Sequence, residues 1–236
     1  VIPEPLMVGV FSVLGLWMVG IWILGAAKYW RDIRSAKTYN ATLKDVLTAI
    51  KYSFSLRYLV GEGEGCTYPG EEPTTSRRWL HHLVGYGFLL TFASTSLAAF
   101  CAHILNSPAP YPVYHPVVIL GTLGGLGQII GTSGLLYLKA KSDKDLADPQ
   151  HDKAGASFIM AIWTVNVTGM FVLLFRETAA MYFLLIVHLA SVAGLFFTAP
   201  YTKFVHFVYR FLSLVNYAQE ERLVKEEEAR LFKTGS

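Results

Sequence analysis

Cysteine is scarce in this sequence, with only Cys66 and Cys101 among 236 residues. Two cysteines so far apart cannot build a disulfide framework, and they cannot supply the ligands of an iron-sulfur cluster. Carboxylates are nearly absent from the long apolar runs, which argues against a proton relay through membrane-embedded acids. Any redox chemistry within this chain must therefore use other residue types.

Charged residues are few, at 16% of the chain, while hydrophobic residues make up 53%. The mean hydropathy of +0.40 is too high for a soluble domain of this length. Five apolar runs can each cross a hydrocarbon core about 30 Å thick as a helix. They cover about 5–27, 79–103, 117–138, 154–175 and 179–209. We predict an all-α integral membrane protein with five transmembrane helices in one domain spanning residues 1–236.

Lysine and arginine are almost confined to one side of this arrangement. With the N-terminus outside, the inner segments are the loop 28–78, the loop 139–153 and the region from Lys203 onward, including the tail 210–236. They hold nine, four and six of the 20 basic residues. The positive-inside rule predicts N-out, C-in topology with a cytoplasmic C-terminus, in a bacterial-type inner membrane. The net charge of +3 is too weak to indicate nucleic-acid binding.

The first run has no basic segment before it and no small-residue cleavage site after it, so we expect a span and not a signal peptide. The chain begins at Val1 and not at Met. We therefore expect that further sequence precedes it in the natural protein.

The loop 28–78 is predicted to contain an amphipathic helix. Thr42 followed by Asp45 resembles a capping box. Apolar residues follow at helical spacing: Leu43, Val46, Leu47, Ile50 and Phe54. The helix either lies on the inner membrane surface or packs on its own loop. The glycine-rich stretch 61–76 should be irregular, serving to dock a partner or as a linker. The tail 217–233 should form a solvated helix.

Glycines recur in the third run, GTLGGLGQIIGTSG at 121–134. Small residues four positions apart allow helix backbones to approach closely, so we predict helix packing. A flat macrocycle lying against the glycines is the alternative.

Histidine is the ionisable residue that the apolar runs do contain. His188 lies within the last run, and His206 follows 18 positions later. At 100° per residue, 18 steps complete five turns, so both would share one helix face about 27 Å apart. An ionisable side chain within a span is costly without a partner inside the bundle, which makes His188 a functional candidate.

The second run offers histidines at matching heights. His103 ends it, and His81 and His82 begin it, about 31 to 33 Å away along a helix. Antiparallel helices would place His81 or His82 level with His206 near the inner face, and His103 level with His188. A low-spin b-type haem takes an imidazole on each side of its iron. The spacing therefore predicts two b haems with His82, His103, His188 and His206 as iron ligands.

The choice between His81 and His82 stays open. Height favours His82, whereas angular phase favours His81, which is ~40° from His103 where His82 is ~60° away. We take His82 as the ligand and keep His81 as the alternative. Four cations lie near the inner histidines: Arg77, Arg78, Lys203 and Arg210. They could neutralise haem propionates, although the positive-inside rule also explains them.

Interfacial histidines bonded to backbone or lipid headgroups are the structural alternative. We expect this role for His115, which precedes Pro116, and for His151, which lies in an Asp-rich loop. Three polar residues within spans are candidate quinone contacts or packing hydrogen bonds: Gln128, Asn166 and Thr164.

The stretch GEGEGCTYPGEEPTTSRRWLHHLVGYGFLLTFAST at 61–95 resembles the membrane part of the tricarballylate-utilisation protein B (TcuB/CitB) family. The resemblance covers most of the chain, and GCTYP followed by RR and HH is its most specific portion. It implies a ferredoxin-like part with iron-sulfur clusters, an FAD-dependent dehydrogenase as electron donor and quinone as acceptor. Because this chain lacks clustered cysteines, the clusters would reside in a missing N-terminal domain or a partner subunit.

The last run is also similar to a late helix of the cytochrome b subunit of respiratory nitrate reductases. That helix carries two haem-ligating histidines at this spacing, and the matching positions are His188 and His206. The second run departs from that pattern, because its histidines are much farther apart here.

We expect an electron-transfer component of an oxidoreductase in the lipid bilayer, with quinone as acceptor. One alternative is a single-haem module ligated by His82 and His206. Others are a haem-free membrane anchor and a transporter, although we find no internal repeat that favours a transporter.

Overall fold

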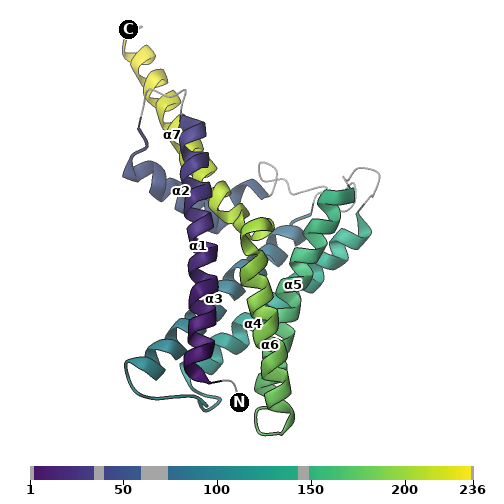
Figure 1. Ribbon diagram of the computed structural model, residues 1–236. Helices are drawn as coiled ribbons and strands as arrows, with labels where there is room; N and C mark the ends of the chain where they lie inside the picture. Colours follow the sequence, from purple (N-terminus) through teal and green to yellow (C-terminus); the bar gives the residue numbers. More distant parts are fainter. Residues whose placement is uncertain (1–2, 35–39, 60–73, 143–148, 235–236) are drawn as a thin grey trace. The chain divides into compact units, whose positions relative to one another are not determined.

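The computed structural model describes residues 3–34, 40–59, 74–142 and 149–234, and these residues are almost entirely helical (Figure 1). The elements are α1 (Glu4–Arg34), α2 (Leu43–Ser55), η1 (Arg57–Leu59), α3 (Ser76–His103), α4 (Pro116–Lys141), α5 (Pro149–Leu174), α6 (Ala180–Thr198), η3 (Ala199–Tyr201), η4 (Lys203–Val205) and α7 (His206–Thr234). The predicted all-α fold is confirmed for the described residues.

Among the described residues, five helical stretches are long and apolar enough to cross a membrane. They are Pro5–Arg34, Ser76–His103, Pro116–Lys141, Lys153–Leu174 and Ala180–Tyr201. Their number and order match the five predicted spans, and the chain is a multi-pass membrane protein. Several helices extend beyond the predicted spans because helical structure continues into polar flanks.

The fifth expected span, 179–209, is not one helix, because α6 ends at Thr198 and α7 begins only at His206. The turns η3 and η4 separate the two helices. Pro200 explains the interruption, because it has no N–H to donate and its ring clashes with a carbonyl of the preceding turn. His188 and His206 therefore lie on different helices. The shared face expected from five whole turns no longer follows.

The chain divides into two compact units. We call Val1–Leu6 with Leu59–Phe196 the four-helix unit, which contains α3, α4, α5 and most of α6. We call Met7–Tyr58 with Phe197–Ser236 the three-helix unit, which contains α2, α7 and most of α1.

In the four-helix unit, α3 and α4 pack backbone to backbone. A Cβ atom on Gly124 would lie 2.7 Å from the carbonyl oxygen of Gly87. Gly125 faces α5 instead, where Sδ of Met170 lies 3.3 Å from an added Cβ. The packing role predicted for the glycine stretch 121–134 is confirmed. These glycines meet neighbouring helices, which leaves no glycine face there for a flat macrocycle.

Gln128 of α4 bridges three helices. Its amide donates to Oγ1 of Thr91 on α3 at 3.0 Å and to Oδ1 of Asn166 on α5 at 3.1 Å. Asn166 donates in turn to the carbonyl oxygen of Ile162 at 2.8 Å. These bonds satisfy amides buried among apolar residues, so packing accounts for both Gln128 and Asn166.

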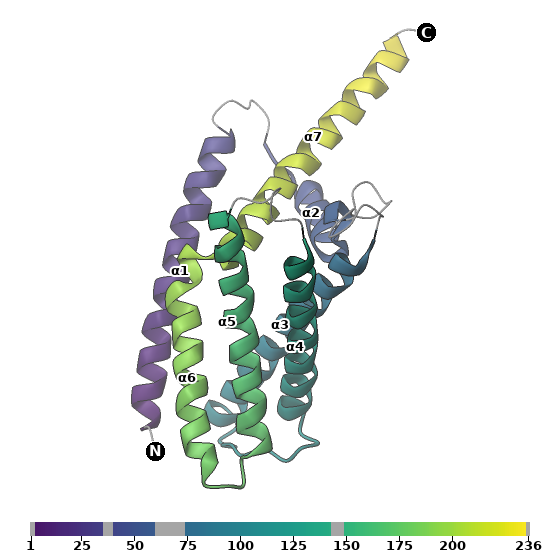
Figure 2. The same cartoon turned by 90° about the vertical axis from the view of Figure 1, so that its right-hand side faces the viewer.

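In Figure 2, α4, α5 and α6 stand side by side in chain order.

In the three-helix unit, α2 packs on α7. The predicted capping box is present. The Thr42 side chain accepts a hydrogen bond from the backbone N–H of Asp45, and the Asp45 carboxylate accepts one from the backbone N–H of Thr42. Ala49 and Tyr52 of α2 pack with Leu214 and Val215 of α7 in a buried cluster. The predicted tail helix is confirmed as part of α7, which is continuous to Thr234.

An ion pair accompanies this packing. The Asp45 side chain, 2% exposed, accepts from Nε of Arg222 on α7 at 2.9 Å. Burial opposes the ionisation of Asp45, but hydrogen bonds from Arg222 and Thr42 outweigh it and lower the pKa of the carboxyl. The pair therefore links α2 to α7 as a charge-assisted contact.

Aromatic contacts join α1 to the chain that follows α6. Trp22 stacks on Phe204 with ring centroids 5.3 Å apart and meets Phe207 edge-on. Near the end of α1, the Tyr29 and Ser213 hydroxyls are hydrogen-bonded at 2.7 Å. These contacts fix α1 against the start of α7.

Candidate functional site

His188 of α6 is half-buried, and it contacts α5. Its ring atom Nδ1 lies 3.1 Å from Oγ1 of Thr168. A Cβ added to Gly169 would lie 3.0 Å from Cε1 of His188, so the ring rests directly on the α5 backbone. The expectation that an ionisable group within a span faces the protein interior holds for His188.

The α3 histidines lie away from α4. Gly87 marks the side of α3 that contacts α4. At 100° per residue, His81, His82 and His103 are about 120° to 160° from Gly87 around the axis. All three therefore lie on the side of α3 that α4 does not cover.

His82 is held by aromatic neighbours on its own helix. Its ring stacks on Tyr86 with centroids 5.4 Å apart, and it lies 5.8 Å from the ring of Trp79. His81 and His82 are half-buried, whereas His103 is exposed. No described hydrogen bond or ring contact links His103 to His188, so their pairing stays a prediction.

His206 opens α7 and belongs to the three-helix unit. Its Nδ1 is hydrogen-bonded to the carbonyl oxygen of Lys203. A carbonyl oxygen only accepts, so Nδ1 carries the proton and a neutral ring keeps its lone pair on Nε2. His81 and His82 belong to the other unit, and the inner pairing with His206 also stays a prediction.

The ring of His115 serves as a helix cap. It caps α4, with Nδ1 accepting from the backbone N–H of Val117 at 3.3 Å, and it stacks on Tyr111 with centroids 4.5 Å apart. The structural role expected for His115 is confirmed. The side chain of His151 and all of Cys66 lie outside the described residues, whereas Cys101 is buried beside Tyr111 and is not in a disulfide.

The four cations expected near haem propionates differ in exposure and in the unit to which they belong. Arg77 is exposed and Arg78 half-buried in the first turn of α3, while Lys203 and Arg210 are exposed in the three-helix unit. Their contact with a propionate stays a prediction.

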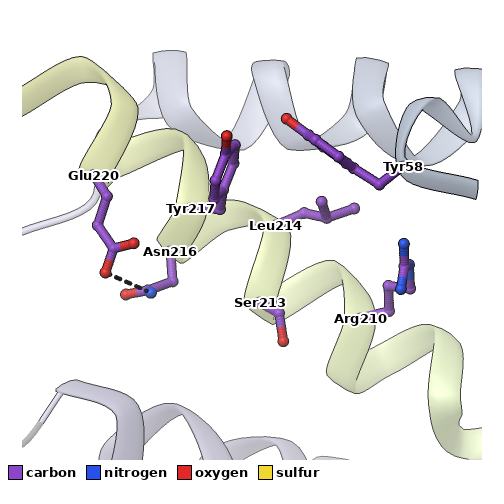
Figure 3. Close-up of a pocket in the computed structure, with 7 residues that line it drawn as sticks. All are labelled: Tyr58, Arg210, Ser213, Leu214, Asn216, Tyr217 and Glu220. Atoms are coloured by element: carbon purple, nitrogen blue, oxygen red, sulfur yellow. Dashed lines mark hydrogen bonds between the residues drawn. The ribbon is translucent and has the colours of Figure 1, made fainter. Parts of the chain in front are cut away.

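Arg210 lines a pocket of about 400 Å³ between α7 and Tyr58 of η1 (Figure 3). The other lining residues are Tyr58, Ser213, Leu214, Asn216, Tyr217 and Glu220. Burial raises the pKa of the Tyr58 phenol, which therefore stays a neutral hydrogen-bonding group at physiological pH. The Tyr58 ring meets that of Tyr217 edge-on, with centroids 5.3 Å apart. Glu220 accepts from Asn216 at 3.2 Å. Guanidinium, phenol and amide groups here could receive an anionic or carbonyl-bearing group.

Sequence reasoning missed the immediate neighbours of His188. Thr168 and Gly169 lie within the apolar run 154–175, and no motif there distinguishes them. Their sequence signal is weak, because threonine and glycine within a span usually serve helix packing. The described residues contain no group of three His, Cys, Asp or Glu side chains that could hold a metal ion.

Comparison with known proteins identifies relatives along nearly the whole chain. Residues 1–227 match the family model described as "CitB: Citrate utilization protein B". The chain is 35% identical over 227 residues to "Citrate utilization protein B" of Escherichia coli. The match covers 96% of this chain but 59% of that relative, so the chain spans about three fifths of its length. No solved structure matches the chain.

Proposed function

This chain belongs to the citrate utilization protein B family, and we propose that it is the membrane electron-transfer module of a tricarballylate-type oxidation system. It would pass electrons from a cluster-bearing partner of a flavoprotein dehydrogenase through b haems to the quinone pool. The single observation that carries this proposal is His188, a half-buried histidine within an apolar helix whose Nδ1 is already engaged. Such a ring can offer Nε2 to iron.

The proposed ligands are His82 and His206 for an inner haem, and His103 and His188 for an outer one, with His81 as the alternative to His82. A b-type haem, when bound, supplies one-electron redox chemistry. The chain's own task is to present neutral imidazoles and exclude water. The His206 ring suits this task, because its Nδ1–H donates to the Lys203 carbonyl. The His115 ring does not suit this task, because its Nδ1 accepts from the Val117 N–H and the proton of the neutral ring then lies on Nε2.

The proposed anion contacts are Arg77, Arg78, Lys203 and Arg210, which would neutralise propionates on the cytoplasmic side. Arg210 is the best supported of them, because it lines a pocket whose other polar groups can share an anionic ligand. The pocket contains one carboxylate, Glu220, which accepts from Asn216.

We propose N-out, C-in topology in a bacterial-type inner membrane, with α2 lying on the cytoplasmic surface. Four apolar side chains of α2 are exposed: Leu43, Leu47, Ile50 and Phe54. Their spacing of three or four residues places them on one stripe, away from the face that packs on α7. Lys44 and Lys51 flank the stripe on one side, where they could meet anionic headgroups.

The proposed partners are an iron-sulfur ferredoxin-like domain or subunit, an FAD-dependent dehydrogenase and quinone. The cluster-bearing partner would dock on the loop 28–78, of which residues 35–39 and 60–73 lie outside the described residues. The greater length of the Escherichia coli relative leaves room for such a domain in the same polypeptide.

The test is a reduced-minus-oxidised visible spectrum of the purified chain, with haem quantified per polypeptide. Two haems per chain are expected. One haem would favour the single-haem module, and none would leave a membrane anchor or a transporter. Addition of a quinol should then reduce the haem, and oxidised quinone should reoxidise it; failure of both reactions would reject quinone as the acceptor.

A further inference from the structure

The hydroxyl of Thr168 is surrounded by three possible partners. It donates to the carbonyl oxygens of Thr164 at 2.8 Å and Val165 at 3.0 Å, and it lies 3.1 Å from Nδ1 of His188. A hydroxyl has one proton, and a carbonyl oxygen can only accept. The proton of Thr168 is therefore directed to its own helix backbone.

The remaining lone pair of the Thr168 oxygen faces the His188 ring. Since that oxygen then accepts, Nδ1 of His188 must carry the proton and donate it. In a neutral imidazole of this tautomer the free lone pair lies on Nε2.

Gly169 lets the ring take up this position. A Cβ at residue 169 would lie 3.0 Å from Cε1 and 3.4 Å from Nδ1 of His188, closer than side chains normally pack. Any larger residue would push the ring away from α5 and lengthen its bond to Thr168. One short segment of α5 thus supplies both the hydrogen-bond acceptor and the space for the ring.

We infer that Thr168 is a positioning residue that holds His188 in the tautomer and orientation required of an iron ligand, with Gly169 providing the necessary clearance. This inference rests on the proposed function. An acceptor at Nδ1 increases the basicity of the ligating imidazole and stabilises ferric iron, which lowers the reduction potential of the haem.

The test compares Thr168→Val, which keeps the shape but removes the hydroxyl, with Thr168→Ser, which keeps the hydroxyl. The full chain is titrated potentiometrically, and low-spin ferric signals are recorded by electron paramagnetic resonance. Thr168→Val should raise the potential of one haem and shift its ferric signal, leaving the other haem unchanged. Thr168→Ser should resemble the natural protein. Gly169→Ala should change the same ferric signal.

His188→Ala identifies the haem concerned, because it should abolish the signal that Thr168→Val shifts. If His188→Ala keeps the full haem content, the ligand assignment of the proposed function fails. If His188→Ala loses a haem but Thr168→Val leaves both potentials and signals unchanged, only the role of Thr168 is overturned. Equal effects of the valine and serine variants, including equal loss of haem, would also overturn it, because the hydroxyl would then be irrelevant. A chain without haem would overturn both.

Discussion

The carbonyl oxygen of Gly87 on α3 lies 2.7 Å from the position that a Cβ atom on Gly124 of α4 would occupy. The two helices are therefore in backbone contact at this level. Because the obstructing atom belongs to the backbone, it cannot move aside as a flexible side chain would.

Gly124→Ala should destabilise the four-helix unit by about 1–3 kcal/mol, the usual cost of overpacking a tight interface. The measurement is the thermal unfolding midpoint of the detergent-solubilised chain. Gly85→Ala on α3 is the matched control, because an added Cβ there meets nothing within 4 Å. It should leave the midpoint unchanged or raise it, since alanine favours helix. An equal loss in both variants would contradict the backbone contact.

Asp45→Asn should destabilise the packing of α2 on α7 by about 1–3 kcal/mol near neutral pH, because it removes the charge that Arg222 donates to. The folded-state pKa of Asp45 lies below its ordinary value of 3.8. Its contribution is therefore present above about pH 4 and lost as the pH falls through the lowered pKa.

Thermal midpoints of the natural chain and of Asp45→Asn should thus converge as the pH falls from 7 to 3. Glu226→Gln is the control, since Glu226 is exposed and pairs with Arg222 only within α7. It should have little effect at any pH. A difference for Asp45→Asn that does not change with pH would reject the ion pair as its cause.

The exposed stripe of α2 should contact lipid. A nitroxide attached at Leu47→Cys, in a background with Cys66 and Cys101 changed to serine, should be more accessible to oxygen than to an aqueous nickel complex. The label at Thr48→Cys, about 100° around the helix, should show the weaker oxygen preference. Preferential access of the nickel complex at position 47 would place the stripe in water.

Haem content should distinguish His188, whose Nδ1 donates a hydrogen bond, from His115, whose Nδ1 accepts one. His188→Ala should remove one haem per chain, because Nε2 of that ring is the proposed iron ligand. His115→Ala should keep every haem, because Nδ1 of that ring accepts from the Val117 N–H, which leaves the proton of the neutral ring on Nε2 and no lone pair there for iron. Loss of haem in His115→Ala without loss of folding, judged by circular dichroism, would contradict this division.

Much of the fold could be predicted because its determinants are local. Runs of apolar residues specify spans through their length, and the capping pattern at Thr42 specifies where α2 begins. Pro200 lies within the last run, and a proline disturbs the helical turn that precedes it. Sequence alone did not show that the disturbance becomes two 3-10 turns and a new helix starting at His206. The tertiary context decides how far a proline-broken helix unwinds.

The candidate site could be predicted only in part. Histidines within spans are conspicuous because they are costly there. Thr168 and Gly169 are not conspicuous in the sequence. A threonine bonded to its own helix backbone and a glycine at a close contact look like ordinary packing residues. Their meaning depends on what the facing helix presents, which in this case is His188.

The sequence by itself determined that this chain is helical, crosses a membrane several times and carries histidines where charge is otherwise avoided, because hydrophobicity and helix length act locally. Only the tertiary structure decided which histidine nitrogen is engaged, that α2 packs an acid against Arg222, and that the glycines of α4 meet α3 and α5. Those features depend on contacts between residues far apart in the chain, and no local pattern encodes the partner.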